Sequence, residues 1–378
     1  MDWQLIESDE ALREMLVRGA GSDAVIVDTE FMRRNTFYPQ VALVQICFAR
    51  EDTSGIDTAW LIDPLTIEDA GPLAALLTDP GVVKVLHSAS EDLEVFQSWL
   101  GVQPQPLFDT QRAAAFVGRG FGMGYRALVQ SICDIDLPKG ETCSDWLQRP
   151  LTASQCEYAA LDVTWLLPVW RQLDRECEEQ GKREWTLADG RAASGNLGTA
   201  VSDYYKRIKT AWKLNSRELG ALAAISEWRE QTARSRDKPR SWIIEDKACL
   251  QLAQQDPQDW AQLKSCAALP PPALRRYGEA LLDVLDKQRT VPEADLPSTL
   301  PGPLDARQRE QVKKLKARVR AIAQDLAMAP EVLLQSKDYE LLLREAHGEA
   351  VVAPGHWQGW RCDIVLEPLR KLLAGDAI

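Results

Sequence analysis

A run of apolar β-branched residues that ends in two acids constrains this chain more than any other feature. It reads Val25-Ile26-Val27-Asp28-Thr29-Glu30-Phe31. Such a run predicts a buried strand that ends in a polar edge. Because strand side chains alternate between faces, Asp28 and Glu30 project from the same face. Taken alone, the pair favours a solvated strand end. The alternative is a site for a divalent cation, which relieves the repulsion between two carboxylates.

Asp92 is a second candidate acid, at the start of a predicted helix. Residues 82–86, which are apolar except for Lys84, predict another buried strand. Ser88 and Glu91 have the spacing of a capping box, which predicts that the helix begins there. Asp92 then lies in the first turns of the helix, near the carboxyl end of the strand, where α/β sheets place their sites. On its own, an acid in a first helical turn indicates only compensation of the helix dipole.

Tyr158 and Asp162 form the third candidate pair. Their i, i+4 spacing places both side chains on one face of a predicted helix. A tyrosine beside an acid is often a packed residue with a satisfied hydroxyl. A phenol in this position can also hydrogen-bond a water molecule and orient it for attack. The pair by itself favours packing, and only the other acids change that balance.

Taken together, these residues resemble the DEDD exonucleases, in the subgroup whose last motif is Tyr-x-x-x-Asp. The five positions that carry the resemblance are Asp28, Glu30, Asp92, Tyr158 and Asp162. Four further segments look like those of the ribonuclease D family, namely residues 31–46, 87–93, 139–146 and 149–151. The resemblance implies a ribonuclease H-like α/β exonuclease domain, with a mixed sheet flanked by helices. Apart from the resemblance, three closely spaced strands, one ending at Phe31 and two at residues 41–48 and 59–62, predict an antiparallel meander.

The C-terminal half is predicted to be helical and resembles the helicase-and-RNase-D C-terminal (HRDC) domain in two copies. The first copy is indicated by Trp228-Arg229-Glu230 and Asp237-Lys238-Pro239, and the second, more weakly, by Gly359-Trp360-Arg361. The expected divisions are an exonuclease domain at 1–178, a connector at 179–210, HRDC-type helical domains at 211–288 and 305–378, and a linker at 289–304. Glycines in residues 178–205 predict a partly extended connector. A chain ending near residue 205 is therefore expected to fold by itself.

The resemblance implies hydrolysis from a 3′ end with two divalent cations, Mg²⁺ or Mn²⁺. The four acids Asp28, Glu30, Asp92 and Asp162 would hold the metals, and Tyr158 would position the attacking water. The implied substrates are precursor tRNA and other small stable RNAs, and the implied products are nucleoside 5′-monophosphates. Residues next to the acids are candidates for contact with the terminal nucleotide, namely Phe31, Met32 and His87.

Two alternatives stay open at this point. The same chemistry on DNA 3′ ends is compatible with the five site residues, because none of them reads the 2′-hydroxyl that distinguishes RNA from DNA. A non-catalytic RNA-binding scaffold is the other alternative, and the presence of all four acids and the tyrosine argues against it. The sequence indicates no dedicated protein partner.

Charge distribution bears on the expected RNA partner. The net charge of −12 argues against a polyanion, but the cations are clustered. Residues 204–240 hold ten Lys/Arg against four Asp/Glu, and residues 307–320 hold seven against one. Each cluster is typical either of a solvated helix face or of a nucleic-acid patch.

The remaining features predict a cytoplasmic protein with no membrane span. No apolar run approaches the length of about 18 residues that a transmembrane helix requires. The eight cysteines include no C-x-x-C pair, and the three histidines do not favour a structural zinc site. This cysteine usage is typical of reduced, mostly buried thiols.

Overall fold

The computed structural model describes residues 2–50, 57–138, 140–141, 144–195, 200–266 and 269–375. The chain divides into two compact units. The first unit contains Met1–Met32, Gln40–Leu197 and Leu304–Ile378, and the second contains Arg33–Pro39 and Gly198–Pro303. The C-terminal helical segment therefore belongs to the same unit as the predicted exonuclease segment, whereas the middle helical segment forms a unit of its own.

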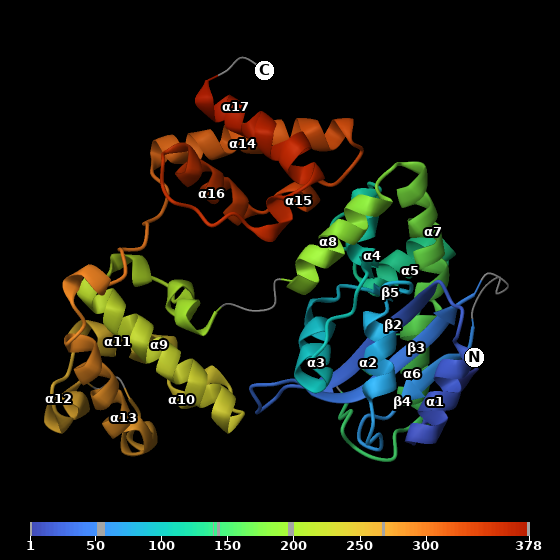
Figure 1. Cartoon of the computed structure of the whole chain (residues 1–378), viewed down its shortest axis with the longest axis horizontal. Helices are drawn as coiled ribbons and strands as arrows, with labels where there is room; N and C mark the ends of the chain where they lie inside the picture. Colours follow the sequence, from blue (N-terminus) through green and yellow to red (C-terminus); the bar gives the residue numbers. More distant parts are fainter. Residues whose placement is uncertain are drawn as a thin grey trace. The chain divides into compact units, whose positions relative to one another are not determined.

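In the described part of the first unit, a six-stranded mixed sheet forms the centre (Figure 1). In chain order its strands are β1 (Trp3–Ile6), β2 (Ala24–Met32), β3 (Gln40–Ala49), β4 (Ala59–Ile62), β5 (Val83–Leu86) and β6 (Leu107–Asp109). Across the sheet they lie in the order β1-β4-β3-β2-β5-β6. β3 pairs antiparallel with β2 and β4, and the other neighbours are parallel. The predicted meander and mixed sheet are confirmed.

Helices cover both faces of this sheet. They are α1 (Asp9–Arg18), α2 (Gly71–Thr78), α3 (Ser90–Leu100), α4 (Thr110–Phe116), α5 (Tyr125–Cys133), α6 (Ala153–Thr164), α7 (Leu166–Glu179) and α8 (Arg183–Gly195). Along β2, Val25 and Val27 share a core with α1, α2 and α3. Ala24 and Ile26 share the opposite core with α4 to α8. Strand alternation then directs Asp28 and Glu30 toward the face that α5, α6 and α7 cover.

Helix α8 contradicts the partly extended connector that the glycines of residues 178–205 predict. Residues 183–195 are helical, and Leu187 is buried in the core beneath the sheet. Gly190 does not break this helix, because its missing side chain lets α8 approach the sheet. A Cβ atom at Gly190 would lie 2.1 Å from the carbonyl oxygen of Leu107 in β6. The glycine that suggested a flexible segment is therefore a contact point between a helix and a strand.

The second unit is built from helices. They are α9 (Ser216–Arg236), α10 (Arg240–Ile243), α11 (Asp246–Gln255), α12 (Trp260–Ser265) and α13 (Pro271–Arg289), with 3-10 turns η1 (Val201–Arg207), η2 (Ala211–Lys213) and η3 (Glu293–Asp295). A capping box between Asn215 and Glu218 starts α9. Asp237 ends it in the left-handed region, and its carboxylate accepts hydrogen bonds from the backbone N–H groups of Phe37 and Tyr38. The connection between β2 and β3 is thus part of this unit.

The C-terminal segment repeats the succession of helices that opens the second unit. Its elements are α14 (Ala306–Asp325), α15 (Pro330–Leu333), α16 (Ser336–Ala346), the 3-10 turn η4 (Gly355–Trp357), the π-helical turn η5 (Cys362–Leu366) and α17 (Glu367–Ala374). Helices α9, α10 and α11 have 21, 4 and 10 residues, and α14, α15 and α16 have 20, 4 and 11. This succession supports the prediction of two related helical domains.

Buried polar contacts join the C-terminal segment to the sheet domain. Lys182 is 4% exposed, and its ammonium donates to the carbonyl oxygens of Phe116 at 2.9 Å and Leu326 at 2.6 Å. Asp189 of α8 forms an ion pair at 2.7 Å with Arg361, whose side chain is 3% exposed. Because buried charges are costly unless they are paired, these contacts fix the two parts against each other.

None of the described helices is both long enough and apolar enough to cross a membrane.

Candidate active site

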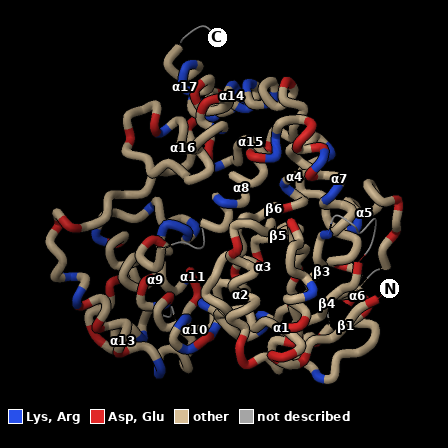
Figure 2. The backbone as a smooth tube through the Cα atoms, turned by 45° about the vertical axis from the view of Figure 1, so that its right-hand side comes forward, with Lys and Arg blue, Asp and Glu red and all other residues tan. Residues whose placement is uncertain are grey.

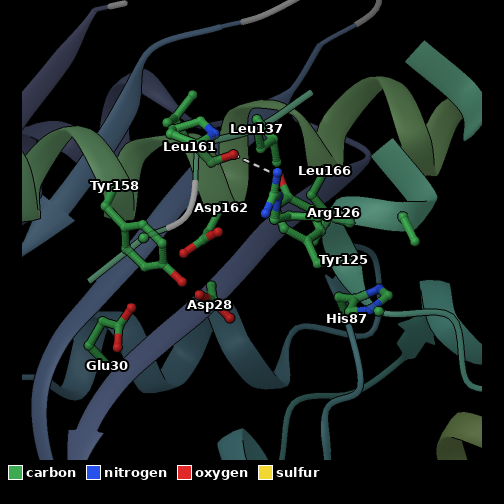
Figure 3. Close-up of a pocket in the computed structure, with 14 residues that line it drawn as sticks. Asp28, Glu30, His87, Tyr125, Arg126, Leu137, Tyr158, Leu161, Asp162 and Leu166 are labelled. Atoms are coloured by element: carbon green, nitrogen blue, oxygen red, sulfur yellow. Dashed lines mark hydrogen bonds between the residues drawn. The ribbon is translucent and has the colours of Figure 1, made fainter. Parts of the chain in front are cut away.

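Three acidic side chains meet beside the C-terminal half of β2, which continues past Asp28 and Glu30 to Met32 (Figure 3). Asp28 and Glu30 come from β2 and Asp162 comes from α6. One carboxylate oxygen of each residue lies within 4.8 Å of the others. The common face of Asp28 and Glu30 is confirmed, since only side chains on one face of the strand can meet the same helix.

Asp92 lies beside this cluster rather than within it. It is buried on α3, and its Oδ1 accepts a hydrogen bond from the Thr29 hydroxyl at 2.5 Å. Thr29 projects from β2 on the opposite face from its neighbours Asp28 and Glu30. Asp92 is still close enough to Asp28 for its charge to raise the pKa of that carboxyl. The four predicted acids therefore converge, with Asp92 approaching from the other side of the strand.

The start of α3 differs from the prediction. The expected capping box of Ser88 and Glu91 is wrong, because Ser88 lies in the left-handed region with φ 60° and the N-cap residue is Ala89. The Asp109 carboxylate instead accepts from the backbone N–H groups of Ser88 at 3.1 Å and Ala89 at 3.0 Å. Asp109 also caps α4 through the N–H of Gln111 at 2.9 Å. An acid remote in sequence thus positions the turn that carries Asp92.

Tyr158 contacts the cluster through its hydroxyl. The phenol donates a hydrogen bond to Asp162 one turn later on α6, as the i, i+4 spacing predicts. Burial, followed by the negative charges of the acids, raises the pKa of Tyr158, so the hydroxyl keeps its proton. A Cβ atom at Gly140 would lie 1.6 Å from the Tyr158 ring. The glycine therefore leaves the space in which the ring stands.

The acids carry raised pKa values because they are buried together. Burial raises the pKa of Glu30 to about 9 and the pKa values of Asp92 and Asp162 to about 7. Burial and the neighbouring acids also raise the pKa of Asp28. A cation at this point replaces protons with its own charge, and the cluster consists only of the oxygen ligands that Mg²⁺ and Mn²⁺ prefer. The residues present therefore fit a divalent metal.

A cavity of about 740 Å³ opens on the clustered acids. Tyr158 and His87 line it with the three acids. Phe31 and Met32 are absent from its lining, so the structure does not place these two predicted substrate contacts at the cavity. Its apolar wall is formed by Leu137, Leu161 and Leu166 (Figure 3).

His87 lies on the cavity wall, where one of its ring nitrogens is hydrogen-bonded and the other is buried. Its Nδ1 is 2.9 Å from the Thr110 hydroxyl. Its Nε2 is buried and has no hydrogen-bond partner within the described ranges. Burial lowers the pKa of the imidazole, which favours the neutral ring. His87 therefore offers a neutral ring rather than a charged donor to a ligand.

Several residues that line the cavity were not among the predicted site residues. Tyr125 donates from its hydroxyl to the carbonyl oxygen of Leu161 at 2.7 Å, and Arg126 and Gly140 lie nearby on the wall. The only local signal is the glycine before Tyr125, which starts α5. In the segment at 139–146, Lys139, Thr142 and Cys143 lie outside the described residues.

Comparisons with known proteins agree with this geometry. A family model described as 3′-5′ exonuclease matches residues 3–178, and one described as HRDC domain matches residues 218–285. Ribonuclease D of Pseudomonas paraeruginosa is 40% identical over 95% of this chain and 94% of its own length. Ribonuclease D of Escherichia coli is 34% identical, and its crystal structure superposes with a TM-score of 0.91 over 99% of both chains. The catalytic core of RRP6 from Trypanosoma brucei, 22% identical with a TM-score of 0.57 over 76% of this chain and 79% of its own, shares the fold.

Proposed function

Since the chain belongs to the ribonuclease D family and is a 3′-5′ exoribonuclease, we propose that its carboxylate cluster trims the 3′ ends of precursor tRNA and other small stable RNAs. Each turn of the reaction hydrolyses the last phosphodiester bond and releases a nucleoside 5′-monophosphate. One observation carries the proposal, namely that Asp28, Glu30 and Asp162 bring carboxylate oxygens within 4.8 Å of one another in a cavity that Tyr158 also lines.

The four acids are assigned to two divalent cations, either Mg²⁺ or Mn²⁺. Asp28 is central to the assignment, because Glu30 and Asp162 lie on one side of it and Asp92 approaches from the other. In this assignment Asp28 would serve both ions, Glu30 and Asp162 would hold the first, and Asp92 would hold the second. When bound, two such ions stabilise the charge on the attacking and leaving oxygens of an in-line displacement. The protein's own part is to bring the four carboxylates together.

Tyr158 is assigned to the attacking water. Its hydroxyl already hydrogen-bonds Asp162, so it lies at the edge of the cluster where a water molecule would approach the terminal phosphate. Because the pKa of the phenol is raised, the group acts as a hydrogen-bond partner and does not take the proton itself. Asp162 fixes the direction of the hydroxyl and therefore the place of the water.

The terminal nucleotide is assigned to the cavity beside the acids. Its apolar walls suit a base, and the neutral ring of His87 adds a surface for packing. We assign no nucleotide contact to Phe31 or Met32, because neither lines the cavity.

The proposed substrates and compartment are inferred from the relatives and from the cysteines. The Escherichia coli enzyme is described as an exoribonuclease involved in structured RNA processing, and folded RNAs such as precursor tRNA are substrates of that class. Every described cysteine is a free thiol, which supports a reducing compartment and hence the cytoplasm. No protein partner is needed for the assigned chemistry.

The experiment that tests the function presents matched 3′-labelled RNA and DNA strands with Mg²⁺ and separates the products. We expect labelled nucleoside 5′-monophosphate from RNA, faster than from DNA. Equal rates on both would favour the DNA alternative instead. An absence of product from either strand would leave only the non-catalytic scaffold.

A further inference from the structure

A second cavity of about 590 Å³ lies where the glycine-rich loop before α5 meets the C-terminal helices. Phe121 comes from the loop, Lys316 and Arg320 come from α14, and Lys337 and Tyr339 come from α16. We call these five residues the groove residues. Three cations and one acid, Glu331, are among the described residues that line the cavity. The net charge of its lining is therefore positive.

The loop presents Phe121 to solvent. Phe121 is 48% exposed, although aromatic residues of this size are usually buried. Gly120 and Gly122 on either side have φ values of 142° and 67°, which side chains other than glycine rarely adopt. On the sheet side, the Gln111 amide donates to the carbonyl oxygen of Met123 at 3.0 Å and so holds the end of the loop. The exposed Phe121 is therefore carried by a loop whose turn depends on two glycines and whose end is held by a hydrogen bond.

The cations of the groove have no acidic partner in the part of the chain that the structure describes. Within the described ranges, Lys316, Arg320 and Lys337 form no ion pair, whereas the neighbouring Lys313 pairs with Glu310. The Lys316 ammonium lies 5.6 Å from the centre of the Tyr339 ring. Figure 2 shows Lys and Arg, in blue, recurring along α14.

The second unit differs in this respect. There Arg234 and Arg240 both pair with Glu230, and Arg229 pairs with Asp246. Part of the basic cluster at 204–240 is therefore committed to the fold of its own unit. The unpaired cations of the groove leave α14 and α16 as the stronger candidates for binding an anion.

The groove lies a short way along the chain from the active-site cavity. Gly124, which lines that cavity, follows Phe121 by three residues, so their Cα atoms are at most about 11 Å apart. Stacked nucleotides rise about 3.4 Å each along one strand, so about three nucleotides span this distance. At the same junction a Cβ atom at Gly118 would lie 2.8 Å from the Ala327 carbonyl oxygen, so loop and C-terminal segment are in close contact.

From these features we infer that the groove binds the single-stranded RNA a few nucleotides before its 3′ end, with a base stacked on Phe121 and phosphates beside Lys316, Arg320 and Lys337. Exposed aromatic rings beside a positive groove are the general means of holding single strands without reading sequence. The inference rests on the proposed function, because it assumes that the 3′ end occupies the acidic cavity.

The test compares a short and a long substrate in the full-length protein. Cleavage of a trimer and of a dodecamer of single-stranded RNA is measured for wild type, for Phe121→Ala and for the double variant Lys316→Ser with Arg320→Ser. For the dodecamer, we expect kcat/KM to fall at least about fivefold in Phe121→Ala, because one base–aromatic stack is lost. For the trimer, which ends before the groove, we expect a change of less than about twofold on the same reasoning.

Matched variants and binding measurements separate the outcomes. Lys314→Ser removes a cation of α14 that does not line the groove, and Phe121→Trp retains a stacking ring, so both should cleave the dodecamer at the wild-type rate. Dodecamer binding in the Asp28→Asn background should show a salt slope shallower by about 0.7 per lost phosphate contact in the double variant.

An unchanged rate and affinity for the dodecamer would overturn the inference and leave the groove to another partner, such as an acidic peptide. Equal losses on trimer and dodecamer would overturn it as well, because Phe121 would then act on the active site. If wild type cleaved neither RNA, the proposed function would fail, and dodecamer binding alone would decide whether the groove holds RNA.

Discussion

The Tyr158 hydroxyl offers the cleanest single-atom test of the catalytic arrangement. Tyr158→Phe keeps the ring that Gly140 and the acids enclose and removes only the group that bonds Asp162. We expect kcat to fall about 100-fold or more with little change in RNA affinity, as for the loss of a positioned catalytic group. Single-turnover kinetics with labelled RNA measure this.

Tyr125→Phe is the matched control for Tyr158→Phe. The Tyr125 hydroxyl binds a backbone carbonyl rather than an acid of the cluster, so its loss should lower stability more than kcat. An unchanged kcat in Tyr158→Phe would make that tyrosine a packing residue.

The raised pKa values of the acids predict a pH-dependent response to metal. In the folded protein the pKa of Asp162 is about 7, whereas the pKa of an aspartate in the unfolded chain is about 3.9. Between these two pH values the folded state binds a proton that the unfolded state has released. The metal-free protein therefore loses stability as the pH rises from about 4 through 7. A cation binds the deprotonated acids, so the increase in melting temperature caused by Mg²⁺ should be larger at pH 8 than at pH 6.

Melting curves with and without Mg²⁺ check this expectation. Asp28→Asn should reduce the metal-induced shift at both pH values, because one ligand is lost. A shift of equal size at pH 6 and pH 8 in the wild type would contradict the assignment of the metal to these acids.

At the scale of elements, Asp109 joins the starts of two helices. Its carboxylate accepts from the backbone of Ser88 and Ala89 before α3 and of Gln111 in α4. Asp109→Ala should lower the free energy of unfolding by about 2 kcal/mol, since the loss of one helix cap costs about 1 kcal/mol. Urea denaturation measures the loss.

Asp305→Ala is the matched control, because Asp305 caps α14 alone. It should cost about 1 kcal/mol. If the two variants lost the same stability, the double role of Asp109 would be wrong.

The sequence predicts elements that have a local pattern and misses those that depend on contacts between distant segments. The strands β2, β3, β4 and β5 can be predicted from the sequence, because apolar residues run almost continuously where both faces of a strand are buried. The parallel pairing of β1 with β4 joins distant segments and leaves no local pattern. The sequence does not predict helix α8, because Gly190 has the local signature of a helix break, whereas in the fold it allows contact with Leu107.

The same distinction holds for the site. The four acids and Tyr158 could be predicted because their spacing and strand context are local. The separation of Asp92 from the other three acids follows from its bond to Thr29, which only the tertiary structure supplies. Tyr125 lines the cavity but belongs to none of the segments that carry the resemblance, so only the tertiary structure places it there.

For the whole molecule, the junction with the C-terminal segment changes the expected effect of truncation. The sequence predicts that a chain ending near residue 205 folds by itself. The structure gives the opposite expectation, because Lys182 and Asp189 would then lose the C-terminal partners that they contact while buried. Arg361→Ala tests the junction without truncation, and it should cost about 1.5–3 kcal/mol, the value of a charged hydrogen bond.

Arg370→Ala is the matched control for Arg361→Ala. Arg370 pairs with Glu345 within the C-terminal segment, and a third of its side chain is exposed. Its loss should cost about 1 kcal/mol or less. Equal unfolding transitions for Arg361→Ala and wild type would show that the junction does not stabilise the sheet domain.

The central claim is that the four acids clustered around β2 form the site that hydrolyses RNA from its 3′ end. Asp28→Asn tests it most directly, in a time course of cleavage of 5′-labelled single-stranded RNA with Mg²⁺, and with chelator as a second condition. The account predicts that wild type produces a ladder that shortens by one nucleotide at a time and stops with chelator. It predicts that the folded variant is slower by at least about 100-fold, because metal-ion catalysis supplies several kcal/mol and each 1.36 kcal/mol is tenfold in rate. A folded Asp28→Asn variant that degrades the RNA near the wild-type rate would contradict the account.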